Sequence, residues 1–186
     1  MPVSELLQSA ESKMAKSVEA TRHEFTLIRT GRANPAMLEH VVVSAYGSDL
    51  PLQQVATVSV PDPRQLLVTP FDRNNLGAIE KGILKSDVNL TPQNDGTAIR
   101  LNIPPLTEER RIEFIKLLHK KIETGHATIR NVRHDCHNHL RALTKSKECG
   151  EDEEKRAQDK LQKMTDLHIA DIDKAGKVKE QELLEV

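Results

Sequence analysis

Apolar residues recur at helical spacing in two long stretches, one toward each end of the chain. In the first stretch, small or apolar residues fall close to a seven-residue period, at Leu7, Met14, Val18, Thr21, Phe25 and Ile28. This period predicts one helix over residues 1–30, with Ser4 as its N-terminal cap. Gly31 follows Thr30, and a glycine there is typical of a helix C-terminus.

The period returns after Pro104 and Pro105 and continues almost to the C-terminus. Two seam positions each recur every seven residues, at Ile115, Ile122, Ile129, Cys136 and Leu143 and at Leu118, Gly125, Val132 and His139. A heptad of this length predicts one long helix from a cap at Thr107 to Lys145. The break at Cys149-Gly150 and the four acidic residues 151–154 predict the start of a third helix, because acidic side chains favour a helix N-terminus.

The intervening residues 31–105 have a different pattern. Stretches rich in β-branched and apolar residues at 41–46, 55–60 and 66–68 predict short strands, with a turn at 47–49. Alternation of Ile99, Leu101 and Ile103 with polar residues predicts a half-buried strand. Asn74 or Asn75 is expected to cap a short helix. These elements indicate a compact module of strands and one helix.

Three apolar stripes of similar length in one chain predict a bundle, because each stripe must be buried against another element. We therefore expect an α+β protein: a long antiparallel three-helix bundle, residues 1–30 and 106–186, with a small inserted domain, residues 31–105. The chain crosses between these parts twice, at 30–32 and 103–105. Thr30, Gly31, Pro104 and Pro105 are the expected hinge residues, since glycine gives freedom and proline gives stiffness.

The charge distribution is asymmetric although the net charge is −1. Residues 107–145 contain nine Lys or Arg and five Asp or Glu, whereas residues 146–186 contain eight and twelve. This asymmetry suits a polyanion partner, and an ordinary solvated face remains the alternative. The four aromatic residues, Phe25, Tyr46, Phe71 and Phe114, are too few for a deep ligand pocket or a base-stacking surface.

The cysteines, Cys136 and Cys149, show no disulfide spacing, and no apolar run approaches the roughly 20 residues of a membrane span. We expect a reduced cytoplasmic protein without a membrane segment. The run His134–His139 contains metal-binding residue types, but only His134 and His137 share a helix face. Two ligands do not make a structural zinc site, so we expect no metal, no cofactor and no catalytic residue.

Arginines are the candidate binding residues. Arg130 and Arg133 lie three residues apart and avoid the apolar seam, Arg110 begins the long helix, and Arg29 and Arg32 flank Gly31. A guanidinium group can donate two hydrogen bonds to the oxygens of one phosphate, and such contacts do not depend on base sequence. These arginines therefore indicate recognition of folded RNA through its backbone.

Four segments together resemble the bacterial ribosome recycling factor family. They are Ile28–Pro35 (IRTGRANP), Phe71–Arg73 (FDR), Pro104–Arg111 (PPLTEERR) and Ile129–Arg133 (IRNVR), and the resemblance covers essentially the whole chain. It implies an L-shaped pair of domains, a three-helix bundle and a β/α/β domain. It also implies a translation factor, not an enzyme, that binds the large ribosomal subunit as a monomer. With elongation factor G and GTP, such a factor splits the post-termination ribosome.

The resemblance also implies roles for particular residues. In the family, arginines matching Arg110, Arg130 and Arg133 lie on the bundle face that contacts large-subunit RNA, and Arg29, Gly31 and Arg32 match its hinge-side motif. The chain departs from many relatives by having His126 and His134 where they have arginine. Neutral imidazole contacts phosphate more weakly near pH 7. Two other functions stay open: a helical adaptor for a protein partner, and a metal-dependent enzyme that uses His134 and His137.

Overall fold

The structure, a computed structural model, describes residues 2–185. Its elements, in chain order, are α1 (Val3–Thr26), η1 (Pro35–Leu38), β1 (Val42–Ala45), β2 (Ser48–Pro51), α2 (Leu52–Val55), β3 (Ala56–Asp62), β4 (Gln65–Pro70), η2 (Arg73–Asn75), α3 (Leu76–Lys85), β5 (Pro92–Asn94), β6 (Ile99–Asn102), α4 (Glu108–Lys145) and α5 (Glu151–Leu184). They form two compact units. The helical unit runs up to Ile28 and again from Glu109 to Glu185, and the second unit runs from Arg29 to Glu108.

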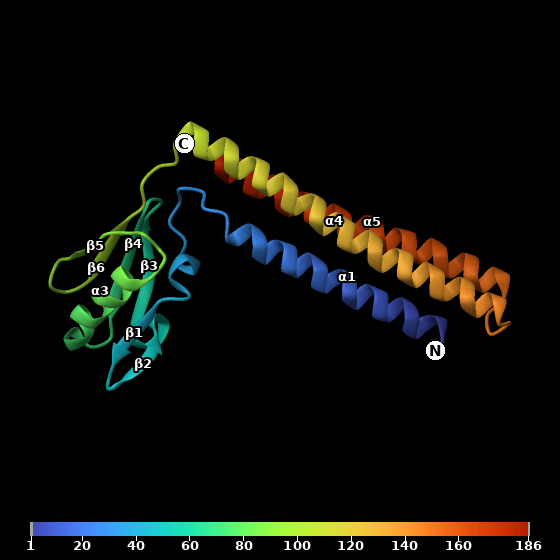
Figure 1. The fold of residues 1–186 in the computed structure, drawn as a ribbon, viewed down its shortest axis with the longest axis horizontal. Helices are drawn as coiled ribbons and strands as arrows, with labels where there is room; N and C mark the ends of the chain where they lie inside the picture. Colours follow the sequence, from blue (N-terminus) through green and yellow to red (C-terminus); the bar gives the residue numbers. More distant parts are fainter. Residues whose placement is uncertain (1, 186) are drawn as a thin grey trace. The chain divides into compact units, whose positions relative to one another are not determined.

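The helical unit is a three-helix bundle of α1, α4 and α5, in which α4 runs antiparallel to the other two (Figure 1). The predicted long helix is confirmed: α4 is one element of 38 residues, or about 57 Å at 1.5 Å per residue. The predicted third helix is also confirmed. It begins at Glu151, directly after Gly150, with four acidic residues in its first turn.

Buried positions in the bundle repeat every eleven residues. The pairs or series are Ala10 and Thr21, Met14 and Phe25, Leu118, Ile129 and Leu140, and Leu161, Ile172 and Leu183. Buried residues seven apart also occur, at Met14 and Thr21, Val18 and Phe25, and Ile129 and Cys136. The predicted heptad is wrong at one position near the C-terminal end of α4: His139 is exposed, and Leu140 is buried.

Two glycines allow close packing within the bundle. A Cβ atom at Gly125 of α4 would lie 2.8 Å from Oγ1 of Thr21 and 3.0 Å from Cδ1 of Ile172. A Cβ atom at Gly176 of α5 would lie 2.5 Å from Cδ1 of Ile122. Neighbouring side chains therefore occupy the space that a larger residue would need.

The second unit contains a four-stranded antiparallel sheet in the order β3-β4-β6-β5 and a separate β1-β2 hairpin. Its core combines side chains of the sheet, the hairpin and α3, including Val43, Leu66, Val68, Ile79, Ile99 and Leu101. The predicted alternation in β6 is confirmed, because Ile99 and Leu101 are buried while Arg100 and Asn102 are exposed. The expected α+β class is likewise confirmed.

Several predicted helix ends are wrong. α1 ends at Thr26, four residues before Thr30. Ser4 lies inside α1, which begins at Val3 after Pro2 and has no side-chain cap. Asn75 occupies the N-cap position of α3, as predicted, but its side chain makes no capping hydrogen bond. One turn earlier, the carboxylate of Asp72 accepts a hydrogen bond from the backbone N–H of Asn74 at 2.9 Å. A short polar side chain two residues upstream competes well for such a donor.

Two short strands were not predicted. β2 was expected as a turn, but Ser48 pairs with Ala45 and Asp49 with Ser44 across a hairpin. β5 is a polar strand of three residues that pairs with β6. Both are mostly exposed and lack an apolar alternation, so cross-strand hydrogen bonds rather than local sequence define them.

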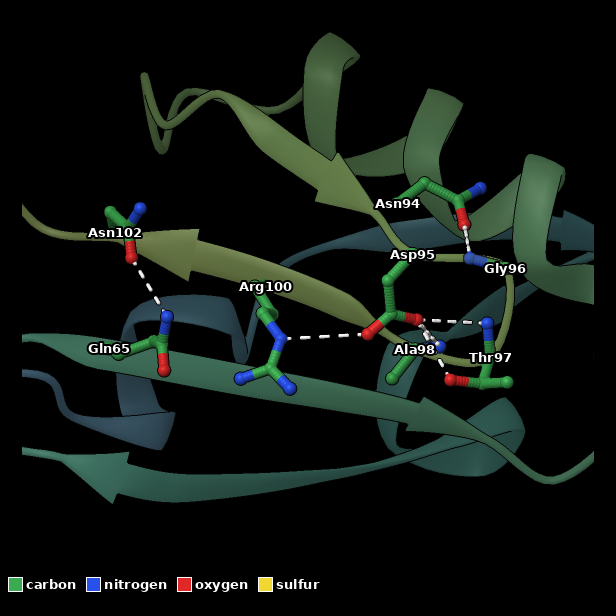
Figure 2. Close-up of polar contacts among 8 residues, drawn as sticks. All are labelled: Gln65, Asn94, Asp95, Gly96, Thr97, Ala98, Arg100 and Asn102. Atoms are coloured by element: carbon green, nitrogen blue, oxygen red, sulfur yellow. Dashed lines mark hydrogen bonds and ion pairs between the residues drawn. The ribbon is translucent and has the colours of Figure 1, made fainter.

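The turn between β5 and β6 is organised by one carboxylate (Figure 2). Oδ1 of Asp95 accepts hydrogen bonds from the backbone N–H groups of Thr97 (2.9 Å) and Ala98 (2.8 Å) and from the Thr97 hydroxyl (2.8 Å). Oδ2 lies 3.5 Å from Nε of Arg100. These donors, the two backbone groups first, lower the pKa of Asp95 to about 2.

No helix within residues 2–185 is long and apolar enough to cross a membrane.

Candidate nucleic-acid interface

The structure brings Arg130 and Arg133 together on one side of α4. Three residues along a helix correspond to a rotation of roughly 60°, the short way round, so the two side chains are neighbours. Arg130 is exposed. Arg133 is partly buried, and its Nη1 donates to Oε1 of Gln162 on α5 at 3.4 Å. A guanidinium has five N–H donors, so this contact leaves Arg133 with others for a ligand.

Two further cationic or titratable residues lie on this side of α4. His137 and Arg141 follow Arg130 by seven and eleven residues, which returns each to nearly the same side of the helix. From the sequence, His137 was expected only as a possible metal ligand, and Arg141 was not among the expected binding residues. Their spacing from Arg130 was the signal that would have identified them.

Arg110 lies elsewhere on the same helix. It precedes Arg130 by 20 residues, about 30 Å along the axis, and it is rotated from Arg130 and Arg133 by roughly 160° and 140°. Its side chain is 66% exposed, and Nη1 lies 3.2 Å from Oε2 of Glu113. Any contact that Arg110 makes with a ligand is therefore separate from that of the Arg130 and Arg133 pair.

His126 and His134, which the sequence offered as candidate phosphate contacts, have different surroundings. The His126 side chain is only 10% exposed; its Nε2 lies 2.8 Å from Oδ1 of Asp173, and its Nδ1 lies 3.5 Å from Oε1 of Glu123. His126 therefore links α4 to α5 and has little surface for a phosphate. His134, by contrast, is exposed.

Arg29 and Arg32 belong to the second unit, at its first crossover. Both are exposed. Nη2 of Arg29 donates to the carbonyl oxygen of Asp87 at 3.4 Å, and the backbone N–H of Arg32 donates to Oγ1 of Thr30 at 3.4 Å. The Arg29 contact holds this crossover against the segment after α3.

The two crossovers contact each other within the second unit. Gly31 has φ of +74°, a left-handed conformation that favours glycine. A Cβ atom there would lie 3.4 Å from the backbone nitrogen of Leu106 and 3.9 Å from the carbonyl oxygen of Pro104. Each crossover is also tied to the β3-β4 turn, through Ala33 N–H to Pro63 O (2.7 Å) and through Ile103 N–H to Arg64 O (2.8 Å).

The described residues contain no group of three or more His, Cys, Asp or Glu that could hold a metal ion. Both cysteines are free and buried. Burial raises the pKa of the Cys136 thiol, which keeps it in the protonated form that is a poor nucleophile.

The fold and this surface together define a class: a two-unit α+β protein whose long central helix presents two neighbouring arginines. Comparison with known proteins identifies the family. A family model described as "Ribosome recycling factor" matches residues 21–184. The ribosome-recycling factor of Carboxydothermus hydrogenoformans is 48% identical over 99% of this chain and 100% of its own length. That of Desulforamulus reducens is 49% identical over the same shares.

Two structures of ribosome recycling factors are also similar to this chain. A solution structure of the ribosome recycling factor superposes with a TM-score of 0.81 at 40% identity, covering 100% of this chain and 99% of the other. A model of the T. thermophilus ribosome recycling factor, reported with E. coli elongation factor G on the E. coli post-termination complex, gives 0.68 at 46% identity over the whole of both chains. The chain belongs to the ribosome recycling factor family, as its four motif segments predicted.

Proposed function

We propose that this chain is a cytoplasmic, monomeric translation factor that acts with elongation factor G and GTP to split the post-termination ribosome into subunits. The observation that carries the proposal is its full-length similarity, at 46% identity, to a recycling factor described on a post-termination complex with that GTPase. The factor itself breaks no covalent bond, and GTP hydrolysis by the partner supplies the free energy.

In this proposal the bundle is the anchor. Arg130 and Arg133 contact phosphate oxygens of large-subunit RNA, and Arg110 makes a separate contact further along α4. An unbroken helix of 38 residues keeps these positions at constant spacing. Phosphate contacts suit the task, because they fix the position of a protein on RNA without reading sequence.

The second unit is the part that moves. Thr30, Gly31, Pro104 and Pro105 lie in the two crossovers and form the hinge, and Arg29 and Arg32 contact RNA beside it. Two adjacent crossovers restrict rotation more than one linker would, since both must turn about a common axis. The close contact of Gly31 with Pro104 and Leu106 supports a hinge whose two segments move as a pair.

The function is tested by incubating polysomes with purified elongation factor G and GTP, with and without this protein, and measuring polysome breakdown. We expect ribosome splitting only when all three are present. A chain that gives no splitting at any concentration, although folded by circular dichroism, would contradict the proposal.

The anchor is tested separately by Arg133→Ala and by a control, Arg156→Ala, which changes an exposed arginine of α5. Binding to large subunits is measured across a salt series. Loss of one phosphate contact should weaken binding and reduce the slope of log K against log salt by roughly 0.7–0.9. Equal effects of the two substitutions would remove Arg133 from the anchor.

A further inference from the structure

One side of α4 carries five side chains that are cationic or can become so. At 100° per residue, positions 130, 133, 134, 137 and 141 fall within an arc of roughly 100°. We call this set the α4 basic stripe; it consists of Arg130, Arg133, His134, His137 and Arg141. Asp135, the one acidic residue in this part of α4, is rotated roughly 140° from Arg130.

The stripe borders a groove of about 390 Å³ between α4 and α5. Arg133, His134 and His137 line it from α4, and Gln158, Asp159 and Gln162 line it from α5. The glutamine amides can donate hydrogen bonds as well as accept them. Among the described residues that line the groove, the one carboxylate is Asp159. Nε2 of Gln158 already donates to Oε1 of Glu154 at 2.7 Å, and Nε2 of Gln162 donates to Oδ1 of Asp166 at 2.8 Å. Each amide nitrogen keeps a second N–H for a ligand.

Histidines along α4 differ in how α5 meets them. Nε2 of His119 lies 3.1 Å from Oε1 of Glu180, and Nε2 of His126 lies 2.8 Å from Oδ1 of Asp173. Each of these two rings is therefore already paired with a carboxylate of α5. Within residues 2–185, neither His134 nor His137 makes a side-chain hydrogen bond or ion pair. Both residues line the groove.

We propose that His134 and His137, together with Arg133, bind a phosphodiester group of RNA in the groove between α4 and α5, and that this contact strengthens as the pH falls below neutral. The inference rests on the proposed function and deepens it, because it adds a pH-dependent site to the arginine anchor. Imidazole is the side chain whose charge ordinarily changes between pH 5 and 8. A phosphate oxygen accepts a stronger hydrogen bond from imidazolium than from imidazole.

The surrounding charges favour an anion. On α4, the charged residues one turn from the two histidines are Arg130, Arg133 and Arg141. On α5, the charged residues at or within one turn of the groove include Glu154, Lys155, Asp159 and Asp166. Glu154 and Asp166 each accept a hydrogen bond from a glutamine that lines the groove. These four cations and three anions carry a net positive charge, which protonation of the two rings would increase.

The test measures binding of the full-length protein to purified large subunits at pH 7.5 and pH 6.0, each across a salt series. The wild-type protein should bind about tenfold more tightly at pH 6.0, because two exposed charge contacts each strengthen binding by about threefold. Its salt slope should also be steeper there, because more phosphate contacts are charged. The H134Q/H137Q double variant should lose this difference between the two pH values.

Two further variants complete the design. His139→Gln changes an exposed histidine on the opposite side of α4 and should leave the pH dependence intact. H134R/H137R should bind tightly at both pH values. The proposal is overturned if the wild-type protein shows no pH dependence, or if H134Q/H137Q retains all of it. Failure of the proposed function looks different: the wild-type protein would not bind large subunits at either pH, and polysomes would stay intact.

Discussion

Gly82 lies where α3 contacts β1, and we predict that Gly82→Ala destabilises the second unit. A Cβ atom there would lie 2.6 Å from the carbonyl oxygen of Val42, about 0.8 Å inside the 3.4 Å at which ordinary contact begins. This oxygen belongs to the backbone of a paired strand and cannot rotate away, so α3 would have to move off the hairpin. Ile79 and Ile83, fully buried on α3, would then lose packing.

The magnitude follows from two opposing effects. Alanine is favoured over glycine in a helix interior by about 1 kcal/mol, and overpacking a core costs about 1–3 kcal/mol. Gly77→Ala is the matched control, because it lies in the same helix and a Cβ atom there would meet nothing within 4 Å. Since both variants share the helical gain, their difference reports the steric cost. We expect Gly82→Ala to be less stable than Gly77→Ala by about 1–3 kcal/mol.

The assay can be confined to the second unit. Tyr46 is the single tyrosine, the chain has no tryptophan, and Tyr46 lies within residues 29–108. Its fluorescence during urea unfolding therefore reports on this unit, whereas far-UV circular dichroism is dominated by the bundle. We expect a lower urea midpoint at an unchanged slope. Equal midpoints for Gly82→Ala and Gly77→Ala would refute the close approach of α3 to β1.

Three further predictions concern other positions. Gly125→Ala should destabilise the bundle by about 1–3 kcal/mol in thermal unfolding followed by circular dichroism. Gly150→Ala should destabilise it less, because a Cβ atom there meets nothing within 4 Å and only the N-cap preference for glycine is lost. Gly31→Ala should destabilise the second unit by about 1–2 kcal/mol because φ is +74°, and Gly31→Asn by less, since asparagine tolerates this conformation; equal effects would contradict the argument. Asp95→Asn should lower stability at pH 7. The folded-state pKa of about 2 lies below the ordinary 3.8, so the carboxylate stabilises the fold fully above about pH 4, and the difference between the proteins should vanish as the pH falls through 2.

The long helices follow from the sequence because their signals are local. The apolar period, the prolines before Thr107 and the acidic run after Gly150 each act within one or two turns, and together they predicted α4 and α5 to within a residue at their starts. The placement of Arg130 and Arg133 on one side of α4 also follows from local sequence. Fixed helical geometry places residues three apart on one side whatever the helix packs against.

Other features depend on contacts between distant parts of the chain. Whether His139 or Leu140 is buried depends on where the neighbouring helices lie, and in the bundle Leu140 is the buried residue. His126 could be read from the sequence as a surface ligand, but Asp173, 47 residues later, engages its ring. β2 and β5 exist because a partner strand satisfies their backbone groups, which no local pattern encodes. The sequence by itself determined the helices and their charged sides; tertiary packing decided which of those side chains remain available to a ligand, because burial and pairing are properties of two segments and not of one.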